Sequence, residues 1–385
     1  MNLPLGFRYS ATYAGIRKLS KDDLALIVSD TPASAAAVFT KNLVVAAPVE
    51  IARRNLRAAR GKVRACLINA GNANCATRTG ELVAIECVRS TAQALGVQPH
   101  EVLPASTGVI GVEMNADLVT KAMAQLAAGL RADRFGDVSQ AIMTTDTRPK
   151  TASTSMKRAS MAGMTKGSGM IQPRMATTLG FVMTDAVATP AELRAALKRA
   201  INVSFNRISV DGDTSTNDMV VVLANGASKF KPSTKVLQGA LTEVLESLAI
   251  QIARDGEGAR KLVTIDVEGA PSERAAETIA RAIANSPLVK TAIAGADPNW
   301  GRVLSAAGNS GVKFDPRKTD IDMQGLPVCR GGLAADFSEA ELQQKLHRSE
   351  CAIRFAIRGQ GRGRARFWTC DLTEEYIRIN ASYRT

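Results

Sequence analysis

A threonine at the end of a glycine-bearing loop is the residue in this sequence best placed to do chemistry. The loop begins at Lys166 and reaches Thr177, eleven positions later, just before residues 179–184, which alternate as expected for a strand. A hydroxyl at a loop-to-strand boundary, preceded by a lysine, indicates a nucleophile. We therefore interpret Thr177 as the nucleophile and the rest of the chain as the structure that positions it.

The base that would activate such a nucleophile is not obvious from the composition. The chain has only two histidines, His100 and His347, and neither lies in a stretch with catalytic character. Both histidines are therefore interpreted as structural. If the protein is an enzyme, we expect its base to be something other than imidazole.

Several polar stretches follow predicted strands and could complete a site. The strand 63–68 ends in a loop of small and amide residues, 69–74, which offers N–H groups and carboxamides; an ordinary turn explains it equally well. Thr107 and Gly108 can present a hydroxyl and a backbone N–H to one point, as an oxyanion hole requires. That signal is weak alone, because Ser-Thr-Gly is common in turns. Residues 141–147 are predicted as a strand that ends in hydroxyl residues.

Metal and nucleic-acid sites have weaker support. The acidic run 211–215 lacks the glycine and the final acid of a calcium loop. Six scattered cysteines form no CxxC pair, so we expect no metal site. Glu257, between two glycines, could bind a cation or could be a surface turn residue. The basic stretch 358–366 lacks the interleaved aromatics of a nucleic-acid contact.

Composition indicates an ordinary globular protein. The chain has 385 residues, 45% hydrophobic and 22% charged, which suggests about two to three domains. A net charge of +13 would allow binding to nucleic acids or acidic small molecules, but the basic residues form no long run. We see neither a signal peptide nor an apolar run long enough for a membrane helix. The expectation is a soluble, cytoplasmic protein without nucleic-acid or membrane partners.

Hydrophobic periodicity predicts a chain that mixes strands and helices. A capping box with proline at the first helical position begins at Thr189, and Ser233 caps a long helix that ends at Arg254. The stretch 151–165 is a loop or a twisted hairpin. Strands are predicted at 24–28, 37–40, 44–47, 63–68, 179–184, 219–223 and 262–267, and further helices at 49–59, 80–95, 116–130 and 272–284.

These pieces together resemble the ornithine acetyltransferase (glutamate N-acetyltransferase, ArgJ) family over nearly the whole chain. The resemblance implies an α/β (α+β) fold: a layered αββα sandwich of the self-processing ArgJ/DmpA-like type with a smaller α+β C-terminal domain. The motifs that carry it are, in order, DLALIVSD, VFTKN with AAPV, NAGNAN, STGVIG, TTDT, KGSGMI with MAT, FNRISVDGDTSTND, RDGEGA, DPNWGR with AAGNSG, and WTCDLTEEYIRIN.

The resemblance implies that the chain cuts itself between Ala176 and Thr177. Residues 1–176 would form an α fragment with the first part of the αββα domain. In the β fragment, residues 177–285 would complete the catalytic domain and 286–385 would form the C-terminal domain that closes the site. The freed α-amine of Thr177, with an ordinary pKa of about 7.7–8.0, would be partly neutral near pH 7 and could act as the base.

The implied reaction is a ping-pong transfer in arginine biosynthesis. Thr177 would take the acetyl group from N2-acetyl-L-ornithine and pass it to L-glutamate, without a cofactor or metal; whether acetyl-CoA also serves as donor stays open. The family pattern makes Thr107 and Gly108 the oxyanion donors. It implies an α2β2 or higher assembly. The remaining positions that match substrate-binding residues of the family are Lys166, Glu257, Asn380 and Thr385, with Thr144 or Thr145.

The sequence departs from the family pattern around the nucleophile. Arg174, Thr178 and Gly180 replace the usual Asn, Met and Ala, and Thr165 stands where a small residue usually precedes the lysine. Three alternatives remain: a self-processing aminopeptidase or amidase in which water accepts the acyl group, a basic nucleic-acid-binding protein, and a catalytically silent homologue.

Overall fold

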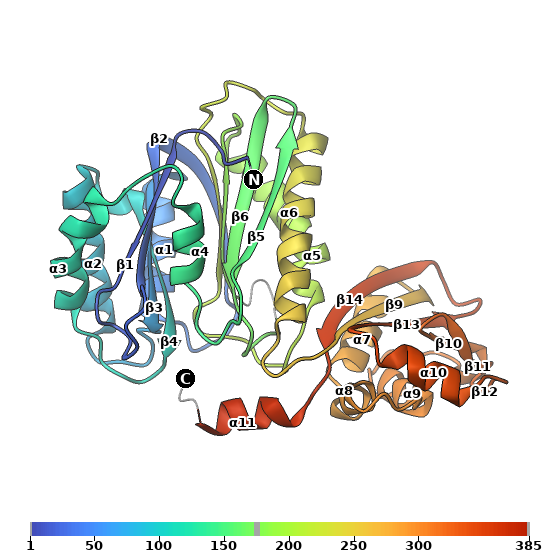
Figure 1. The fold of residues 1–385 in the computed structure, drawn as a ribbon. Coiled ribbons are helices and arrows are strands. Elements are labelled where there is room, and N and C mark those ends of the chain that lie inside the picture. Colours follow the sequence, from blue (N-terminus) through green and yellow to red (C-terminus); the bar gives the residue numbers. More distant parts are fainter. Residues whose placement is uncertain (1, 173–177, 383–385) are drawn as a thin grey trace. The chain divides into compact units, whose positions relative to one another are not determined.

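The structure is a computed structural model that describes residues 2–172 and 178–382 (Figure 1). The chain folds into two compact units. Unit 1 is formed by the described residues of Met1–Asn206 and Asp213–Ala249, and unit 2 by those of Arg207–Gly212 and Ile250–Tyr383.

Unit 1 is built on an eight-stranded arrangement with the order β4-β3-β2-β8-β7-β6-β5, in which β1 pairs with β2. The strands are β1 (Phe7–Thr12), β2 (Leu24–Phe39), β3 (Lys62–Asn72), β4 (Val102–Val109), β5 (Lys150–Met156), β6 (Ala159–Lys166), β7 (Leu179–Thr184) and β8 (Met219–Ala224). The helices are α1 (Ala47–Ala58), α2 (Gly80–Leu95), α3 (Ala116–Ala128), α4 (Phe135–Ala141), α5 (Pro190–Val203) and α6 (Thr234–Arg254), the last of which continues into unit 2.

The long strand β2 joins two groups of strands. Leu24–Val28 pairs with both β1 and β3, whereas Ser34–Phe39 pairs with β8, and the register with β3 shifts between Val28 and Ala33. The predicted strands 24–28 and 37–40 are therefore two parts of one element. One half of β2 belongs with β1, β3 and β4, and the other half with β5–β8.

The two strand groups face each other across a shared core. Side chains alternate between the two faces of a strand, and one face of β2 and β3 packs with one face of β7 and β8. The residues that do so include Ala25, Ile27, Cys66, Ile68, Leu179, Phe181, Met183, Met219, Val221 and Leu223. All six residues of β7 and of β8 are buried, as expected for strands covered on both faces.

Helices cover the outer faces. Leu24, Leu26 and Val28 of β2 pack in a separate core with residues of α2 and α3. On the other side, a Cβ at Gly163 of β6 would lie 2.9 Å from Val244 of α6, so glycine lets the helix approach the strand closely. Unit 1 is therefore an αββα sandwich, which confirms the expected fold class.

Helix α6 is 21 residues long and apolar enough to span a membrane by length and composition, with half of its most apolar window buried. The sequence predicted this long helix between Ser233 and Arg254, but its apolar length was not recognised as sufficient for a membrane span. Its apolar residues are buried in the protein, with Leu241, Leu248 and Ile252 each 0% exposed. The burial is typical of a core helix.

Unit 2 contains a six-stranded sheet with the order β12-β11-β10-β13-β9-β14. Its strands are β9 (Leu262–Ala270), β10 (Thr319–Met323), β11 (Leu326–Arg330), β12 (Leu333–Ala334), β13 (Glu350–Ile357) and β14 (Gly363–Cys370). Its helices are α7 (Glu273–Ala284), α8 (Pro287–Ala294), α9 (Trp300–Gly308), α10 (Glu339–Leu346) and α11 (Glu374–Ser382), and α7–α10 contribute to one core with the sheet.

Ion pairs connect neighbouring strands of the unit 2 sheet. Arg354 of β13 contacts Glu268 of β9 at 2.9 Å and Asp322 of β10 at 3.0 Å, and Arg366 of β14 contacts Asp266 of β9 at 2.7 Å. The basic stretch 358–366 thus ends in an arginine that has a carboxylate partner within the sheet.

Two predicted strands are wrong. Residues 44–47 form no strand: Val44 is 54% exposed, and the N–H groups of Ala46 and Ala47 bond to loop carbonyls instead of a ladder. Residues 141–147 also form none, because Ala141 ends α4, whose buried residues recur at helical spacing. By contrast, the capping box of α5 is confirmed, and 151–165 is largely the β5–β6 hairpin.

Candidate active site

Strand ends that are distant in sequence meet at one edge of unit 1. Lys166, the last residue of β6, pairs with Leu179 of β7, and Met219 of β8 donates its N–H to the carbonyl of Thr178 at 2.9 Å. The Nζ of Lys166 donates to Oγ1 of Thr107 in β4 at 3.2 Å. The structure thus brings together two predicted site residues that are 59 positions apart.

Gly108 lies in β4 directly beside the backbone of β3. It pairs with Gly71 and has a φ of +129°. A Cβ at this position would lie 2.4 Å from the carbonyl carbon of Gly71, closer than atoms can approach. Only glycine therefore fits beside Thr107, and the pair predicted to bind an oxyanion has a defined backbone conformation.

The contact between Lys166 and Thr107 has a chemical consequence. An ammonium group can only donate hydrogen bonds, so the Thr107 oxygen must be the acceptor. The proton of the threonine hydroxyl is then directed away from the lysine and can be donated to another oxygen. A positive charge beside the hydroxyl also strengthens it as a donor. Thr107 and Lys166 together are suited to stabilise a developing negative charge.

A buried carboxylate, Asp146, joins the two segments predicted to contact substrate. It accepts hydrogen bonds from the N–H of Thr144 at 2.9 Å and of Gly167 at 2.7 Å, and it pairs with Nζ of Lys150 at 2.6 Å. Burial alone would raise the pKa of Asp146, but the charges of Lys150 and Lys166 and the hydrogen bonds from Lys150 and Gly167 lower it to about 2. Asp146 is therefore ionised at neutral pH.

The threonines that the sequence could not distinguish have different roles here. Thr144 contributes its backbone N–H to Asp146, whereas the hydroxyl of Thr145 lies 2.8 Å from the hydroxyl of buried Ser168. Both threonines are half-buried. Sequence reasoning missed Asp146 and Ser168. The sequence signal for Asp146 was Lys150, four positions later. The structure shows that both side chains are buried.

Asp218 is a second buried carboxyl near this edge, immediately before β8. Burial raises its pKa well above the ordinary value, although the charge of Lys166 and hydrogen bonds to Ser215 oppose the shift. Among the described residues, none forms a hydrogen bond with its Oδ2 atom. Asp218 was missed because it stood inside a long polar run; its place directly before a wholly apolar strand was the available signal.

Three departures from the family pattern contact one another. The hydroxyl of Thr165 lies 2.8 Å from that of Thr178 and 3.0 Å from the carbonyl oxygen of Leu179. The Thr178 hydroxyl also contacts the carbonyl of Lys166. Each hydroxyl carries one proton, so one threonine donates to the other, which in turn donates to its carbonyl. Thr165 pairs in the β6–β7 ladder with Gly180. The substitutions therefore form one hydrogen-bonded group beside Lys166.

In unit 2, two further predicted residues lie together. Asn380 of α11 donates from Nδ2 to Oε2 of buried Glu257 at 2.8 Å. The loop that carries Glu257 is held by the C-terminal segment: Thr373 donates to the carbonyl of Gly258 at 2.7 Å, and Asp371 accepts from the N–H of Lys261 at 2.9 Å. Glu257 is thus a fixed carboxylate in contact with an amide.

Some predicted residues lie outside the described part of the chain. These are Ala176 and Thr177 at the proposed cleavage site, Arg174 beside it, and Thr385. Within 2–172 and 178–382, no group of three or more His, Cys, Asp or Glu residues could hold a metal ion.

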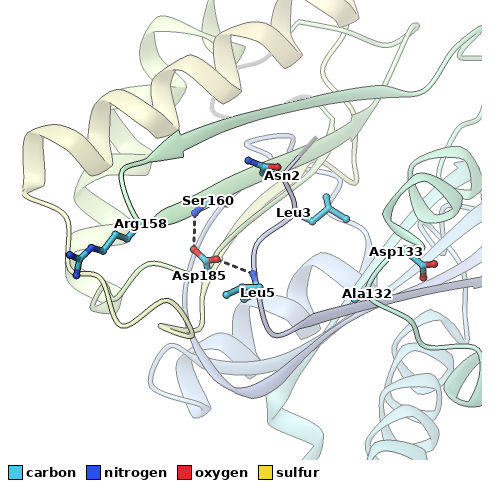
Figure 2. A pocket seen from close by; sticks show the side chains of 8 residues that line it. All are labelled: Asn2, Leu3, Leu5, Ala132, Asp133, Arg158, Ser160 and Asp185. Atoms are coloured by element: carbon cyan, nitrogen blue, oxygen red, sulfur yellow. Dashed lines mark hydrogen bonds between the residues drawn. The ribbon is translucent and has the colours of Figure 1, made fainter.

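A shallow cavity of about 520 Å³ lies elsewhere in unit 1 (Figure 2). Asp185 in its wall accepts hydrogen bonds from the N–H of Leu5 at 3.0 Å and of Ser160 at 2.8 Å. The cavity is lined by Asn2, Leu3, Leu5, Ala132, Asp133, Arg158, Ser160 and Asp185. The described residues that were assigned to the site are not among these.

Removing the partner of Asp146 should be strongly destabilising. We expect Lys150→Met to lower the free energy of unfolding by about 3–5 kcal/mol, because it leaves a buried carboxylate without that charge. Chemical denaturation would measure this change. The control is Lys121→Met, which breaks an exposed pair with Asp117 at the same spacing and should cost less than about 0.5 kcal/mol.

The same pair gives a pH dependence with a defined sign. Because the pKa of Asp146 falls from 3.8 to about 2 on folding, the carboxylate stabilises the protein above pH 3.8. That contribution, about 2 kcal/mol, is lost as the pH falls towards 2. Lys150→Met should lack this loss. Equal acid sensitivity in the variant and the unmodified protein would contradict the assignment.

The contact between Thr165 and Thr178 can be tested by a double-mutant cycle. Thr165→Ala and Thr178→Met should each lower the free energy of unfolding by about 0.5–1.5 kcal/mol, since each removes the hydrogen bond between the two buried hydroxyls. The double variant should lose less than the sum, with coupling of about 0.5–3 kcal/mol. Thr184→Ala, at the other end of β7, is the control and should add to Thr165→Ala independently. Additive losses for Thr165 and Thr178 would refute the coupling.

Comparison with known proteins identifies the family of this chain. The model of the ArgJ family matches residues 8–385. The chain is 46% identical to the arginine biosynthesis bifunctional protein ArgJ of Dehalococcoides mccartyi, over 99% of this chain and 96% of that protein. It is 45% identical to the protein of the same name from Thermus thermophilus, over the full length of both.

A solved structure is also similar. The crystal structure of arginine biosynthesis bifunctional protein ArgJ from Bacillus halodurans has a TM-score of 0.51 and 43% identity, and it covers 53% of this chain and 98% of that one. The family model matches nearly the whole chain, and the relatives share 45–46% identity over nearly their whole length. This chain therefore belongs to the ArgJ family.

Proposed function

We propose that this chain is an acetyltransferase of arginine biosynthesis that moves the acetyl group of N2-acetyl-L-ornithine to L-glutamate. Its identity of 45–46% over the full length of relatives named as bifunctional ArgJ proteins carries the proposal. The hydrogen bond between Lys166 and Thr107 lies beside Gly108, where only glycine fits. This arrangement suits the negative charge that develops on the acetyl oxygen during transfer. The reaction needs no metal or prosthetic group.

Self-cleavage between Ala176 and Thr177 would come first. The Thr177 hydroxyl would attack the carbonyl of Ala176, the acyl group would shift from nitrogen to oxygen, and water would hydrolyse the ester. The solved Bacillus halodurans chain supports this step, because nearly all of it aligns with only 53% of the present chain. A cut after Ala176 would leave a β fragment of similar length.

Each half of the transfer would then use the same groups. The neutral α-amine of Thr177 takes the hydroxyl proton, and the oxygen attacks the acetyl carbonyl. Thr107 and Gly108 donate to the oxyanion, and the ornithine nitrogen leaves with the proton. Glutamate's neutral amine next attacks the carbonyl of the acetyl-threonine and gives a proton to the α-amine. The bond between the Thr177 oxygen and the acetyl carbon then breaks, and the α-amine passes the proton to that oxygen.

Other residues would hold the substrates. Glu257 and Asn380 suit the cationic amino groups of ornithine, and Thr145, with Ser168, offers hydroxyls beside Lys166. Thr385 would contribute by the family pattern. Lys166 would attract the carboxylate of the substrate while it polarises Thr107.

The two fragments would stay associated after cleavage. The cut lies between β6 and β7, which are hydrogen-bonded neighbours from Met161–Thr184 to Lys166–Leu179. The ladder between β2 and β8 also joins the two parts of the chain. We infer a heterodimeric unit that assembles to α2β2 or higher in the cytoplasm, with residues 286–385 as its C-terminal domain.

Self-cleavage is tested by intact mass spectrometry. The unmodified protein should give two fragments that meet between residues 176 and 177, and Thr177→Ala should give one full-length chain. Thr177→Ser retains a hydroxyl and should still be cut, at a different rate. An unmodified protein that remains a single chain would contradict the mechanism.

The acceptor distinguishes the transferase from an aminopeptidase or amidase of related type. With N2-acetyl-ornithine as donor, we expect ornithine release to depend on glutamate and to yield N-acetylglutamate, because the acyl-enzyme is intercepted by the amine. Chromatography of the products would measure this. Equally fast release of ornithine and acetate without glutamate would favour the hydrolase. Replacing the donor by acetyl-CoA tests whether the chain also acetylates glutamate from that donor.

A further inference from the structure

Asn217, which has no role in the mechanism above, contacts the strand that carries the oxyanion pair. It is 4% exposed and lies two residues before β8. Its Nδ2 atom donates to the carbonyl of Ser106 at 2.9 Å and to that of Ala73 at 2.7 Å. Ser106 is the residue immediately before Thr107.

The orientation of this carboxamide is fixed. Its two N–H groups are used by the two carbonyls, and its Oδ1 accepts from the hydroxyl of Thr216 at 2.5 Å. In the sheet order, β2 and β3 separate β8 from β4, so the contact with Ser106 is not part of a strand ladder. The side chain makes a separate connection across the strand ends.

The oxyanion pair lies between two anchored carbonyls. Asn217 holds the carbonyl of Ser106, and the N–H of Ala73 donates to the carbonyl of Val109 at 3.0 Å. Asn217 also binds the carbonyl of Ala73, so its side chain contacts both the residue before the pair and the residue that holds Val109. Thr107 and Gly108 are the two residues between them.

We propose that Asn217 is a positioning residue that fixes Thr107 and Gly108 in the geometry needed to stabilise the oxyanion. The inference rests on the proposed acetyltransferase function. Donors stabilise a transition state only if they are held where its charge develops, and a displacement of about 1 Å can cost roughly 10²-fold in rate. Asparagine suits the task because one side-chain nitrogen donates to two carbonyls without introducing a charge.

The chain contains a matched control for this role. Asn55 of α1 is also buried, and its Nδ2 donates to the carbonyls of Val102 at 2.8 Å and Pro99 at 3.2 Å. Val102 is the first residue of β4, at the end away from Thr107. Asn55→Ala therefore also removes two bonds to backbone carbonyls, one of them in β4 and the other in the turn before it, without touching the oxyanion pair.

The experiment compares Asn217→Ala with Asn55→Ala in the cleaved enzyme. Both should lower the melting temperature. Only Asn217→Ala should lower kcat of acetyl transfer, by about 10²-fold, with KM for N2-acetyl-ornithine nearly unchanged, because substrate contacts remain. Thr107→Val should lower kcat by roughly 10²–10³-fold, and adding Asn217→Ala to it should bring little further loss.

Several outcomes would overturn the inference. They are an unchanged kcat in Asn217→Ala, an equal loss in Asn55→Ala, or losses that multiply when Asn217→Ala and Thr107→Val are combined. If Asn217→Ala accumulates uncleaved, cleavage becomes the readout. Slow cleavage in both Asn217→Ala and Thr107→Val but not in Asn55→Ala then supports the inference, and slow cleavage in Asn217→Ala alone refutes it. An inactive unmodified protein would instead disprove the proposed function.

Discussion

The charge of one buried carboxylate determines how the site segments of unit 1 are held. Asp146 must be compensated because an ion in the protein interior is unfavourable without partners. Its partners are the Lys150 ammonium and the N–H groups of Thr144 and Gly167. Gly167 follows Lys166, so the requirement to satisfy Asp146 also fixes the lysine that reaches Thr107. A structural ion pair thereby sets the position of a functional contact.

The same physical solution recurs across the molecule. Side chains with amide or carboxyl groups bind backbone atoms and add connections that the strand ladders do not make. Asn217 binds the carbonyls of Ser106 in β4 and of Ala73 after β3, and Asp371 binds N–H groups beside the loop of Glu257. Such bonds hold backbone groups in place, and none of them uses a histidine side chain. They suit an enzyme whose base would be the amine of its own nucleophile.

Local patterns predicted the elements well where pattern and packing agree. The alternation of residues 179–184 and the capping box at Thr189 are both confirmed. The strands predicted at 44–47 and 141–147 are wrong. At 44–47 the β-branched residues suggested a strand, but Val44 is exposed. At 141–147 the first residue instead ends a helix whose buried residues recur at helical spacing. The proximity of Thr107 and Lys166 followed only from the family resemblance, since nothing local links residues 59 positions apart. Asn217 was missed for the same reason, because its partners Ser106 and Ala73 are more than 100 positions away. Asp146 was missed although one of its partners, Lys150, stands only four positions later.

The central claim is that the acetyl group passes through Thr177. The most direct test is the mass of the 177–385 fragment after incubation with N2-acetyl-ornithine alone. The account predicts one added acetyl group, located on Thr177, that disappears when glutamate is added and N-acetylglutamate forms. Full transfer activity with no acetyl group ever detected on this fragment would contradict the account.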